Sequence, residues 1–329
     1  MPAESPQTAG SVPPANLQRQ AEAAYLGLAV GDALGATVEF LTPREIRCAF
    51  AAQHGIHREI VGGGWLHLPP GQVTDDTTMS LALGEAILQR DGTVEAQACA
   101  RAFDAWMRGK PVDIGNTVRR NLMRFRRHGN PQVPPSEHDA GNGAAMRVLP
   151  VALALHDADE RTLCDAVRVQ AHVTHHNAES DAACEFLVLA LHDGLHGTTL
   201  RRLYRERIHP FVNRHPQFRY RPRRAENPSG YVVHTLHAVL QALLDTGSFE
   251  ECLIDVVNRG GDADTTGAIA GMLAGVLYGL ESIPLRWLRA LNPDIRARCR
   301  GQARALIERR HSPNTASTYA TNSYGRSDA

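Results

Sequence analysis

The sequence has very little lysine and few aromatic residues. Only one basic side chain is lysine (Lys110), and aromatic residues make up 5% of the 329 residues. We attribute the scarcity of lysine to base composition in the genome. Basic and acidic side chains number 35 each, so the formal net charge is zero. The chain therefore lacks the overall positive charge typical of nucleic-acid-binding proteins, and we expect no nucleic-acid partner.

The sequence also lacks paired cysteines, a secretory signal and a long apolar run. None of the six cysteines forms a CxxC pair, which favours reduced thiols in a cytoplasmic protein. The N-terminus shows no basic segment followed by an apolar one. The longest apolar stretch, Ala268–Leu280, is shorter than the roughly 20 residues that span a bilayer.

What is present is helical periodicity, and 43% of the residues are apolar, enough for a sizeable core. Convincing alternating strands are missing. We predict an all-α, single-domain body over residues 18–310, with a disordered segment at 1–17 and a flexible tail at 311–329. The expected helices cover residues near 18–36, 77–90, 94–108, 115–127, 143–156, 160–171, 178–194, 231–245, 249–258, 265–280 and 284–308.

Two of these helices carry glycine at every fourth residue. The series are Gly27, Gly31 and Gly35, and then Gly267, Gly271, Gly275 and Gly279. Glycine costs about 1 kcal/mol relative to alanine inside a helix, so its repetition on one face needs a reason. We expect two central helices that approach their neighbours closely; the alternative is that the glycines break these helices.

Two acidic clusters each precede a run of small and apolar residues. Thr74, Asp75 and Asp76 open the first, and Asp262, Asp264 and Thr265 follow a Gly-Gly pair in the second. Either cluster alone could simply cap a helix. If both helix starts meet, however, four carboxylates can hold two divalent cations that activate a shared water. Glu39 could supply a further carboxylate.

Other segments offer weaker candidates. One candidate segment, at the expected start of a helix, contains Asp113, Gly115 and Asn116. These residues either cap the helix or present polar groups at the edge of a cleft. The Gly141-Asn142-Gly143 loop could present backbone N–H groups to a diphosphate. His175 lies in a run of three histidines that suits ligand contact better than zinc, because no HExxH motif or nearby cysteine accompanies it. Tyr231 starts a helix and could be core or cleft wall.

One basic stretch has no assigned role. The segment 201–224 carries nine arginines and one acid, Glu206. It is either a docking patch for an acidic partner or a solvated connection between helices.

Taken together, the motifs resemble those of one known family. The stretches GLAVGDALGATVEF, GQVTDDTTMSLALGEAI, PVDIGNT, GNGAAMR, HVTHHN, GYVVHTL and VVNRGGDADTTGAIAGMLAG follow one another in the family order. The sequence is similar to the ADP-ribosylglycohydrolase family from about residue 20 to residue 300. The resemblance implies a compact all-α fold with two Mn²⁺ or Mg²⁺ ions.

The resemblance also implies roles for individual residues. Thr74, Asp75, Asp76, Asp262, Asp264 and Thr265 would bind the metals, with Glu39 beside them. Asp113 and Asn116, with Gly115 between them, would face the ribose and the scissile bond. Gly141, Asn142, Gly143, His175 and Tyr231 would hold ADP-ribose. We expect Asp113, Asp76 and Glu39 to take part in catalysis.

The expected reaction is hydrolysis of the bond between ADP-ribose and an arginine of a protein. The motifs are most similar to those of members that act on the nitrogenase iron protein, which implies that target, regulation by a PII signalling protein and recruitment to the membrane surface. We expect a monomer. The alternatives are hydrolysis of another ADP-ribose linkage or of a free ADP-ribose derivative, and a catalytically silent homologue. Intact aspartates disfavour the silent homologue.

Overall fold

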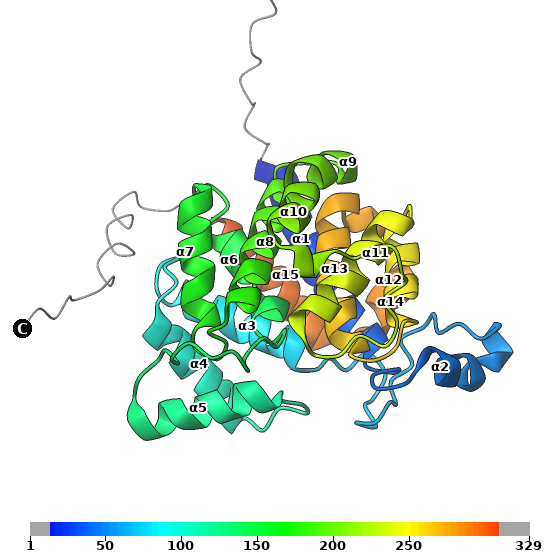
Figure 1. Cartoon of the computed structure of the whole chain (residues 1–329), viewed down its shortest axis with the longest axis horizontal. Coiled ribbons are helices and arrows are strands. Elements are labelled where there is room, and N and C mark those ends of the chain that lie inside the picture. Colours follow the sequence, from blue (N-terminus) through cyan, green and yellow to red (C-terminus); the bar gives the residue numbers. More distant parts are fainter. Residues whose placement is uncertain (1–13, 309–329) are drawn as a thin grey trace, which may run out of the picture.

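The computed structural model describes residues 14–308 and shows a single all-α domain (Figure 1). Over these residues the β-structure is confined to two isolated bridges, Gly63 with Leu68 and Gly141 with Tyr231. The helices are α1 (Pro14–Gly35), α2 (Pro43–Ala49), α3 (Asp75–Leu88), α4 (Ala96–Arg108), α5 (Asn116–His128), α6 (Leu149–Ala154), α7 (Glu160–Ala171), α8 (Ala178–Leu195), α9 (Leu200–Leu203), α10 (His209–Arg214), α11 (Val232–Asp245), α12 (Phe249–Val257), α13 (Ala263–Tyr278), α14 (Leu285–Ala290) and α15 (Pro293–Glu308).

The boundaries differ from expectation in a few places. The expected helix over 284–308 is divided into α14 and α15, because Pro293 lacks an N–H and disfavours helix in the residue before it. Of the expected helix 143–156, only α6 and a 3-10 turn at Ala145–Arg147 form. The expected terminal segments lie outside the described residues, except for 14–17, which begin α1. No described helix has the length and hydropathy that crossing a membrane requires.

The glycine series brings α1 and α13 into backbone contact. A Cβ atom on Gly31 would lie 1.9 Å from the carbonyl oxygen of Gly267, and one on Gly271 would lie 2.0 Å from that of Gly27. Since any side chain there would overlap backbone, glycine is required along this seam. The expected close approach is confirmed, and the neighbour of each glycine helix is the other. At the end of α13, Gly279 has φ +83 and terminates the helix.

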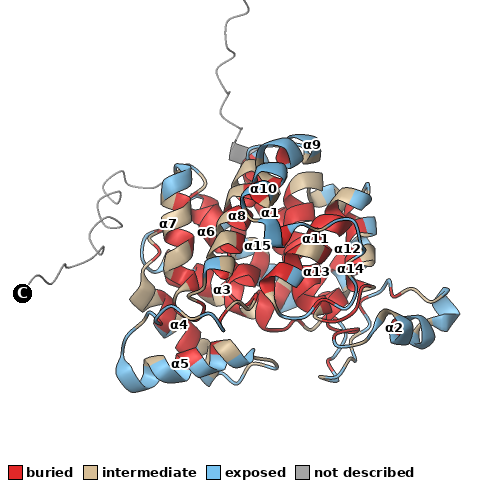
Figure 2. Ribbon diagram, viewed as in Figure 1, coloured by how far each residue is buried: buried red, intermediate tan, exposed pale blue. Residues whose placement is uncertain are grey.

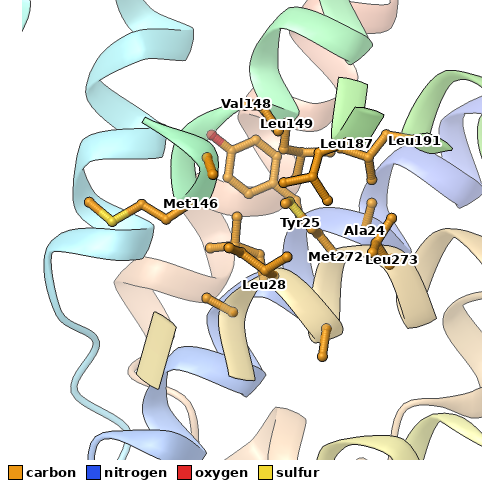
Figure 3. Close-up of a cluster of buried hydrophobic side chains, with 14 of the residues drawn as sticks. Ala24, Tyr25, Leu28, Met146, Val148, Leu149, Leu187, Leu191, Met272 and Leu273 are labelled. Atoms are coloured by element: carbon orange, nitrogen blue, oxygen red, sulfur yellow. The ribbon is translucent and has the colours of Figure 1, made fainter. Parts of the chain in front are cut away.

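The core surrounds this helix pair. Tyr25 and Leu28 of α1, Leu187 of α8 and Met272 of α13 pack together with the buried Met146 (Figure 3). Figure 2 shows buried residues concentrated in the central helices, whereas α2 and α5 are largely exposed. Because the backbones of α1 and α13 are in contact as far as Gly35 and Ala263, the segments that follow α1 and precede α13 are held next to each other.

Candidate active site

The two acidic clusters meet at the N-termini of α3 and α13. The hydroxyl of Thr74 donates to Oδ2 of Asp264 at 3.3 Å, and the hydroxyl of Thr265 donates to Oδ2 of Asp76 at 3.2 Å. The sequence separation of these pairs is about 190 residues. The fold therefore brings together the two clusters that the sequence singled out as candidate metal ligands.

Asp32 of α1 anchors this junction, and sequence reasoning assigned it no role. Its carboxylate accepts the backbone N–H of Thr74 at 2.9 Å and that of Thr77 at 3.0 Å, and also both threonine hydroxyls. It thereby caps α3 from a neighbouring helix, since no side chain of the local sequence does so. The available signal was a single aspartate within the apolar and small residues from Ala23 to Leu34.

Glu39 completes the acidic cluster. One carboxylate oxygen from each of Glu39, Asp262 and Asp264 can lie within 4.8 Å of the others, close enough to share one cation. Oε2 of Glu39 accepts the indole N–H of Trp65 at 2.7 Å. Trp65 and Phe40 are exposed aromatic residues whose rings lie 5.4 Å apart beside Glu39. Trp65 could not be placed at the site from the sequence, because it lies outside the motifs and its partner Glu39 is 26 residues away.

Burial raises the pKa of every carboxyl group in the cluster. For Glu39 burial, with nearby Asp262 and Asp113, raises the pKa to about 8. For Asp75 burial and Asp113 raise it to about 7, and for Asp32 burial raises it to about 6. Burial first, and then neighbouring carboxylates, raise the pKa of Asp76 and Asp264 well above the ordinary value; burial also raises that of Asp262.

These carboxylates fit a metal site. Within residues 14–308 none of them forms an ion pair with arginine, lysine or histidine, and Oδ1 of Asp76 is buried without a hydrogen-bond partner. Uncompensated buried charge is costly unless it is paired or bound to a metal. The donors are all carboxylate or hydroxyl oxygens, the ligands that Mg²⁺ and Mn²⁺ prefer. The side chains present therefore suit divalent cations.

A cleft of about 500 Å³ opens above the cluster. It is lined by most of the predicted site residues, namely Glu39, Asp75, Asp113, Gly115, Asn116, Gly141, Asn142, Gly143, His175, Asp262, Asp264 and Thr265. Thr74 and Asp76 lie beneath this lining, and Tyr231 stands outside it. A larger groove of about 1180 Å³, between α3, α4 and α15, has a single acidic residue, Glu85, in its wall, so volume alone does not identify the site.

The segment before α5 forms one edge of the cleft. α5 begins at Asn116 with Gly115 as its N-cap, so Asp113 precedes the helix and does not open it as expected. The N–H of Gly115 donates to Oδ2 of Asp75 at 3.3 Å, which ties this segment to the acidic cluster. Asp113 and Asn116 line the cleft from this edge, although they do not share a helix face.

The Gly141–Gly143 loop also lines the cleft, but it does not open a helix as expected. The N–H of Asn142 donates to the carbonyl of Gly230 at 3.0 Å, and α6 begins only at Leu149. The expected helix N-terminus at this loop is therefore wrong. Instead, the side-chain amide of Asn142 donates to Asp262 and to Thr235, and so orients a carboxylate of the cluster.

His175 lies behind this loop, and its imidazole ring is neutral. A Cβ atom on Gly143 would lie 2.9 Å from its ring, so glycine there allows the ring to approach the cleft. Burial and the nearby Arg147 lower the pKa of His175 to about 3, which keeps it neutral. Arg147 donates to the Thr174 oxygen at 2.7 Å, and that hydroxyl lies 2.8 Å from Nδ1 of His175. Because arginine only donates, this chain favours a proton on Nε2.

The remaining two histidines of the motif serve structure. The rings of His172 and His176 stack at 3.7 Å, with His172 beside Asp181 and His176 beside the carbonyl of Val133. Among the residues that the structure describes, the three histidines form no metal-binding group. Tyr231 pairs its backbone with Gly141, and its hydroxyl donates to Glu179 at 2.6 Å.

Comparisons with known proteins agree with this geometry. The chain is 48% identical over 286 residues to ADP-ribosyl-[dinitrogen reductase] glycohydrolase of Rhodospirillum rubrum, a match covering 86% of this chain and 94% of that protein. It is 33% identical to ADP-ribosylarginine hydrolase Tri1 of Serratia proteamaculans (strain 568), over 85% of this chain and 77% of that protein.

A solved structure agrees as well. The structure titled ADP-ribosylglycohydrolase-related protein complex superposes with a TM-score of 0.78 at 38% identity, covering 89% of this chain and 98% of that one. The family model for ADP-ribosylglycohydrolase matches residues 13–316. From its fold, its acidic cluster and these matches, the chain belongs to the ADP-ribosylglycohydrolase family.

Proposed function

We propose that this chain hydrolyses the N-glycosidic bond between C1 of ADP-ribose and the guanidinium group of an arginine in a protein. The observation that carries the proposal is the buried cluster of carboxylates at the floor of the cleft, which has no basic partner in the described chain. The similarity to two hydrolases named for ADP-ribosylated arginine or dinitrogen reductase supports this bond as the target.

The residues that would hold two cations, Mn²⁺ or Mg²⁺, are Thr74, Asp75, Asp76, Asp262, Asp264 and Thr265. When bound, such cations lower the pKa of a coordinated water so that hydroxide is available near neutral pH. Asp76 lies beneath the cleft lining, so it would contribute as a ligand and not by touching substrate. Glu39 lines the cleft beside the proposed metal ligands. Its carboxyl group would hold a proton or bind a cation there.

The other residues of the cleft would bind and orient ADP-ribose. Neutral His175 presents an Nε2–H donor behind the Gly141–Gly143 loop, which suits an oxygen of the ribose or diphosphate. Asn116 offers an amide at the edge of the cleft formed by the start of α5. Asp113 stands at that same edge, where its carboxylate can accept a proton from the attacking water and pass it to the leaving guanidine.

The experiment compares three substrates with the purified chain: ADP-ribosyl-arginine, ADP-ribosyl-serine and O-acetyl-ADP-ribose. We expect Mn²⁺-dependent release of ADP-ribose from the first at a rate far above the others. Faster hydrolysis of either of the others would assign a different linkage. No release from any of the three, with metal bound, would indicate a silent homologue.

We further propose dinitrogen reductase, the iron protein of nitrogenase, as the target. The support is the 48% identity to the Rhodospirillum rubrum hydrolase named for that substrate. Recovery of nitrogenase activity after treatment of ADP-ribosylated iron protein would test it. A PII signalling partner, recruitment to the membrane surface and a monomeric state stay predictions; size-exclusion chromatography with and without a PII protein would test the first and third.

A further inference from the structure

α5 carries an unusual concentration of positive charge at the mouth of the cleft. Its thirteen residues include five arginines and no acid. The helix packs on α4 through one face, burying Val118, Asn121 and Leu122, and its other face is exposed (Figure 2). The whole chain has zero formal net charge, but α5 taken by itself is strongly basic.

Three of these arginines have no partner in the described chain. Arg126 pairs with Asp104 and Arg120 pairs with Asp139, but Arg119, Arg124 and Arg127 are exposed and form no ion pair within residues 14–308. We call Arg119, Arg124 and Arg127 the α5 ridge. The α5 ridge leaves three guanidinium groups available to a ligand.

Helix stability does not account for this arrangement. Basic residues in the last turn favour the helix dipole, which explains Arg126 and Arg127. Arg119 and Arg120 are the fourth and fifth residues of the helix, where the dipole does not favour positive charge. Arg120 and Arg124 are four residues apart, and like charges at that spacing destabilise a helix. The charge is therefore retained at a cost to the helix.

The α5 ridge is continuous with the catalytic cleft. A second hollow, of about 450 Å³, is lined by Arg119, Arg124 and Arg127 and shares Asn116 and Arg119 with the cleft. At 1.5 Å per residue, Arg127 lies about 12 Å further along the helix axis than Arg119, the length of about four extended residues. A small substrate in the cleft would leave the far end of the ridge untouched, whereas a protein substrate would cover it.

A second arginine-rich region serves as a comparison because of where it lies. In the segment 201–224 five of the nine arginines form ion pairs, as in Arg207 with Asp193 and Arg224 with Asp255, whereas the other four, such as Arg201 and Arg214, form none within residues 14–308. α9 and α10 of this segment lie at the opposite end of the molecule from α5 (Figure 1). Arg201 of α9 and Arg214 of α10 are therefore exposed and without an ion pair in residues 14–308, but lie far from α5, which makes them a matched comparison for the α5 ridge.

We propose that the α5 ridge binds acidic side chains next to the modified arginine of the protein substrate. Planar guanidinium groups match carboxylates in a bidentate geometry. A protein partner fits better than a nucleic acid, because three free arginines on a neutral chain give few phosphate contacts. This inference rests on the proposed hydrolysis of arginine-linked ADP-ribose and adds the chemistry by which a target sequence is selected.

The test uses the full chain and three probes: ADP-ribosyl-arginine, and two peptides of equal length in which ADP-ribosyl-arginine is flanked within four residues either by aspartate and glutamate or by serine. The test variant is Arg124→Ala/Arg127→Ala. The matched control is Arg201→Ala/Arg214→Ala, which removes two exposed arginines that form no ion pair within residues 14–308. Circular dichroism checks that each variant is folded.

We expect wild type to prefer the acidic peptide over the serine peptide, with a preference that weakens as salt is added. The test variant should lose about tenfold in kcat/KM on the acidic peptide and change less than about twofold on ADP-ribosyl-arginine. The control variant should match wild type on all three. The reversal Arg124→Glu/Arg127→Glu should make the acidic peptide the poorer substrate.

Equal turnover of the two peptides by wild type, or equal losses in the test and control variants, would overturn the proposal. So would tight binding of a short DNA duplex by wild type that the test variant loses, because the ridge would then recognise phosphates. If wild type released no ADP-ribose from ADP-ribosyl-arginine itself, the proposed function would fail first, an outcome distinct from a failure of the ridge alone.

Discussion

The carboxylate of Asp32 accepts the backbone N–H of Thr74 at 2.9 Å, across 42 residues of sequence. The same carboxylate accepts the N–H of Thr77 and both threonine hydroxyls. α1 thus supplies the cap that orients the first residues of α3, and two of those residues, Asp75 and Asp76, are proposed metal ligands. Asp32 therefore positions proposed metal ligands through the backbone of α3 and is not itself a proposed ligand.

We predict that Asp32→Asn lowers the free energy of unfolding by about 1–3 kcal/mol, because an amide has one acceptor oxygen where the carboxylate has two and leaves buried donors unsatisfied. Urea unfolding in EDTA measures this without any contribution from metal. Asp157→Asn is the control, since Asp157 is exposed and precedes α7. Equal stability of the two variants would show that the cap contributes nothing.

Much of this site was predictable from sequence, because the ligands lie in short local motifs. Oxygen donors stand at two helix starts, Thr74–Asp76 and Asp262–Thr265. This pattern can be recognised without knowing the fold. Asp32 and Trp65 were missed because each acts on a residue distant in sequence: Asp32 on Thr74 and Trp65 on Glu39. No local spacing encodes such pairs.

The helix order was predictable for a similar reason. The predicted boundaries were wrong where tertiary contacts determine the end of a helix. Apolar periodicity indicated α3, α7 and α8 nearly to their ends. It could not indicate that Ala145–Arg147 forms only a 3-10 turn and that α6 begins at Leu149. Glycine spacing predicted a close approach, but only the fold shows that α1 and α13 are partners.

The second prediction concerns that contact. Gly31→Ala should lower the free energy of unfolding by about 3 kcal/mol or more, because the new Cβ would lie 1.9 Å from the Gly267 oxygen and force the helices apart. Gly301→Ala in α15 is the matched control, since a Cβ there meets nothing within 4 Å. It should raise stability by about 0.5–1 kcal/mol. Similar effects at both positions in thermal unfolding would contradict the tight seam.

The third prediction concerns metal and pH together. The pKa is raised to about 8 for Glu39, about 7 for Asp75 and about 6 for Asp32. A carboxyl whose pKa is raised by folding stabilises the fold below its unfolded pKa, near 4, and this contribution is lost as pH rises through the folded pKa. In EDTA the melting temperature should therefore fall between about pH 5 and pH 8.5.

Added Mn²⁺ should reverse this trend, because cation binding needs the deprotonated carboxylates and strengthens over the same window. The increase in melting temperature with Mn²⁺ should be larger at pH 8.5 than at pH 5, and Zn²⁺ should restore less activity than Mn²⁺ after EDTA treatment. Glu39→Gln should flatten the decline in EDTA. An increase with Mn²⁺ that is independent of pH would argue against a carboxylate site.

The fourth prediction separates the ligands from the proton carrier. Asp262→Ala should lose metal and activity by orders of magnitude while the fold survives, because its carboxylate faces the cleft. Metal content, by elemental analysis, and turnover on ADP-ribosyl-arginine are measured on the same sample. Full activity with full metal occupancy would remove Asp262 from the ligand set.

Asp113→Asn should also lose turnover, but it should keep its metal. Asp113 lines the cleft but is not among the carboxylates grouped closely enough to share a cation, so its neutralisation should leave metal occupancy near wild type. Turnover should fall by roughly 10²–10⁴, the usual range for the loss of a general acid or base. Binding of ADP-ribose, measured by calorimetry, should stay within about tenfold, equivalent to about 1.4 kcal/mol. Loss of metal would make Asp113 a ligand, whereas unchanged turnover would leave the leaving guanidine without its proton donor and require another residue of the cleft.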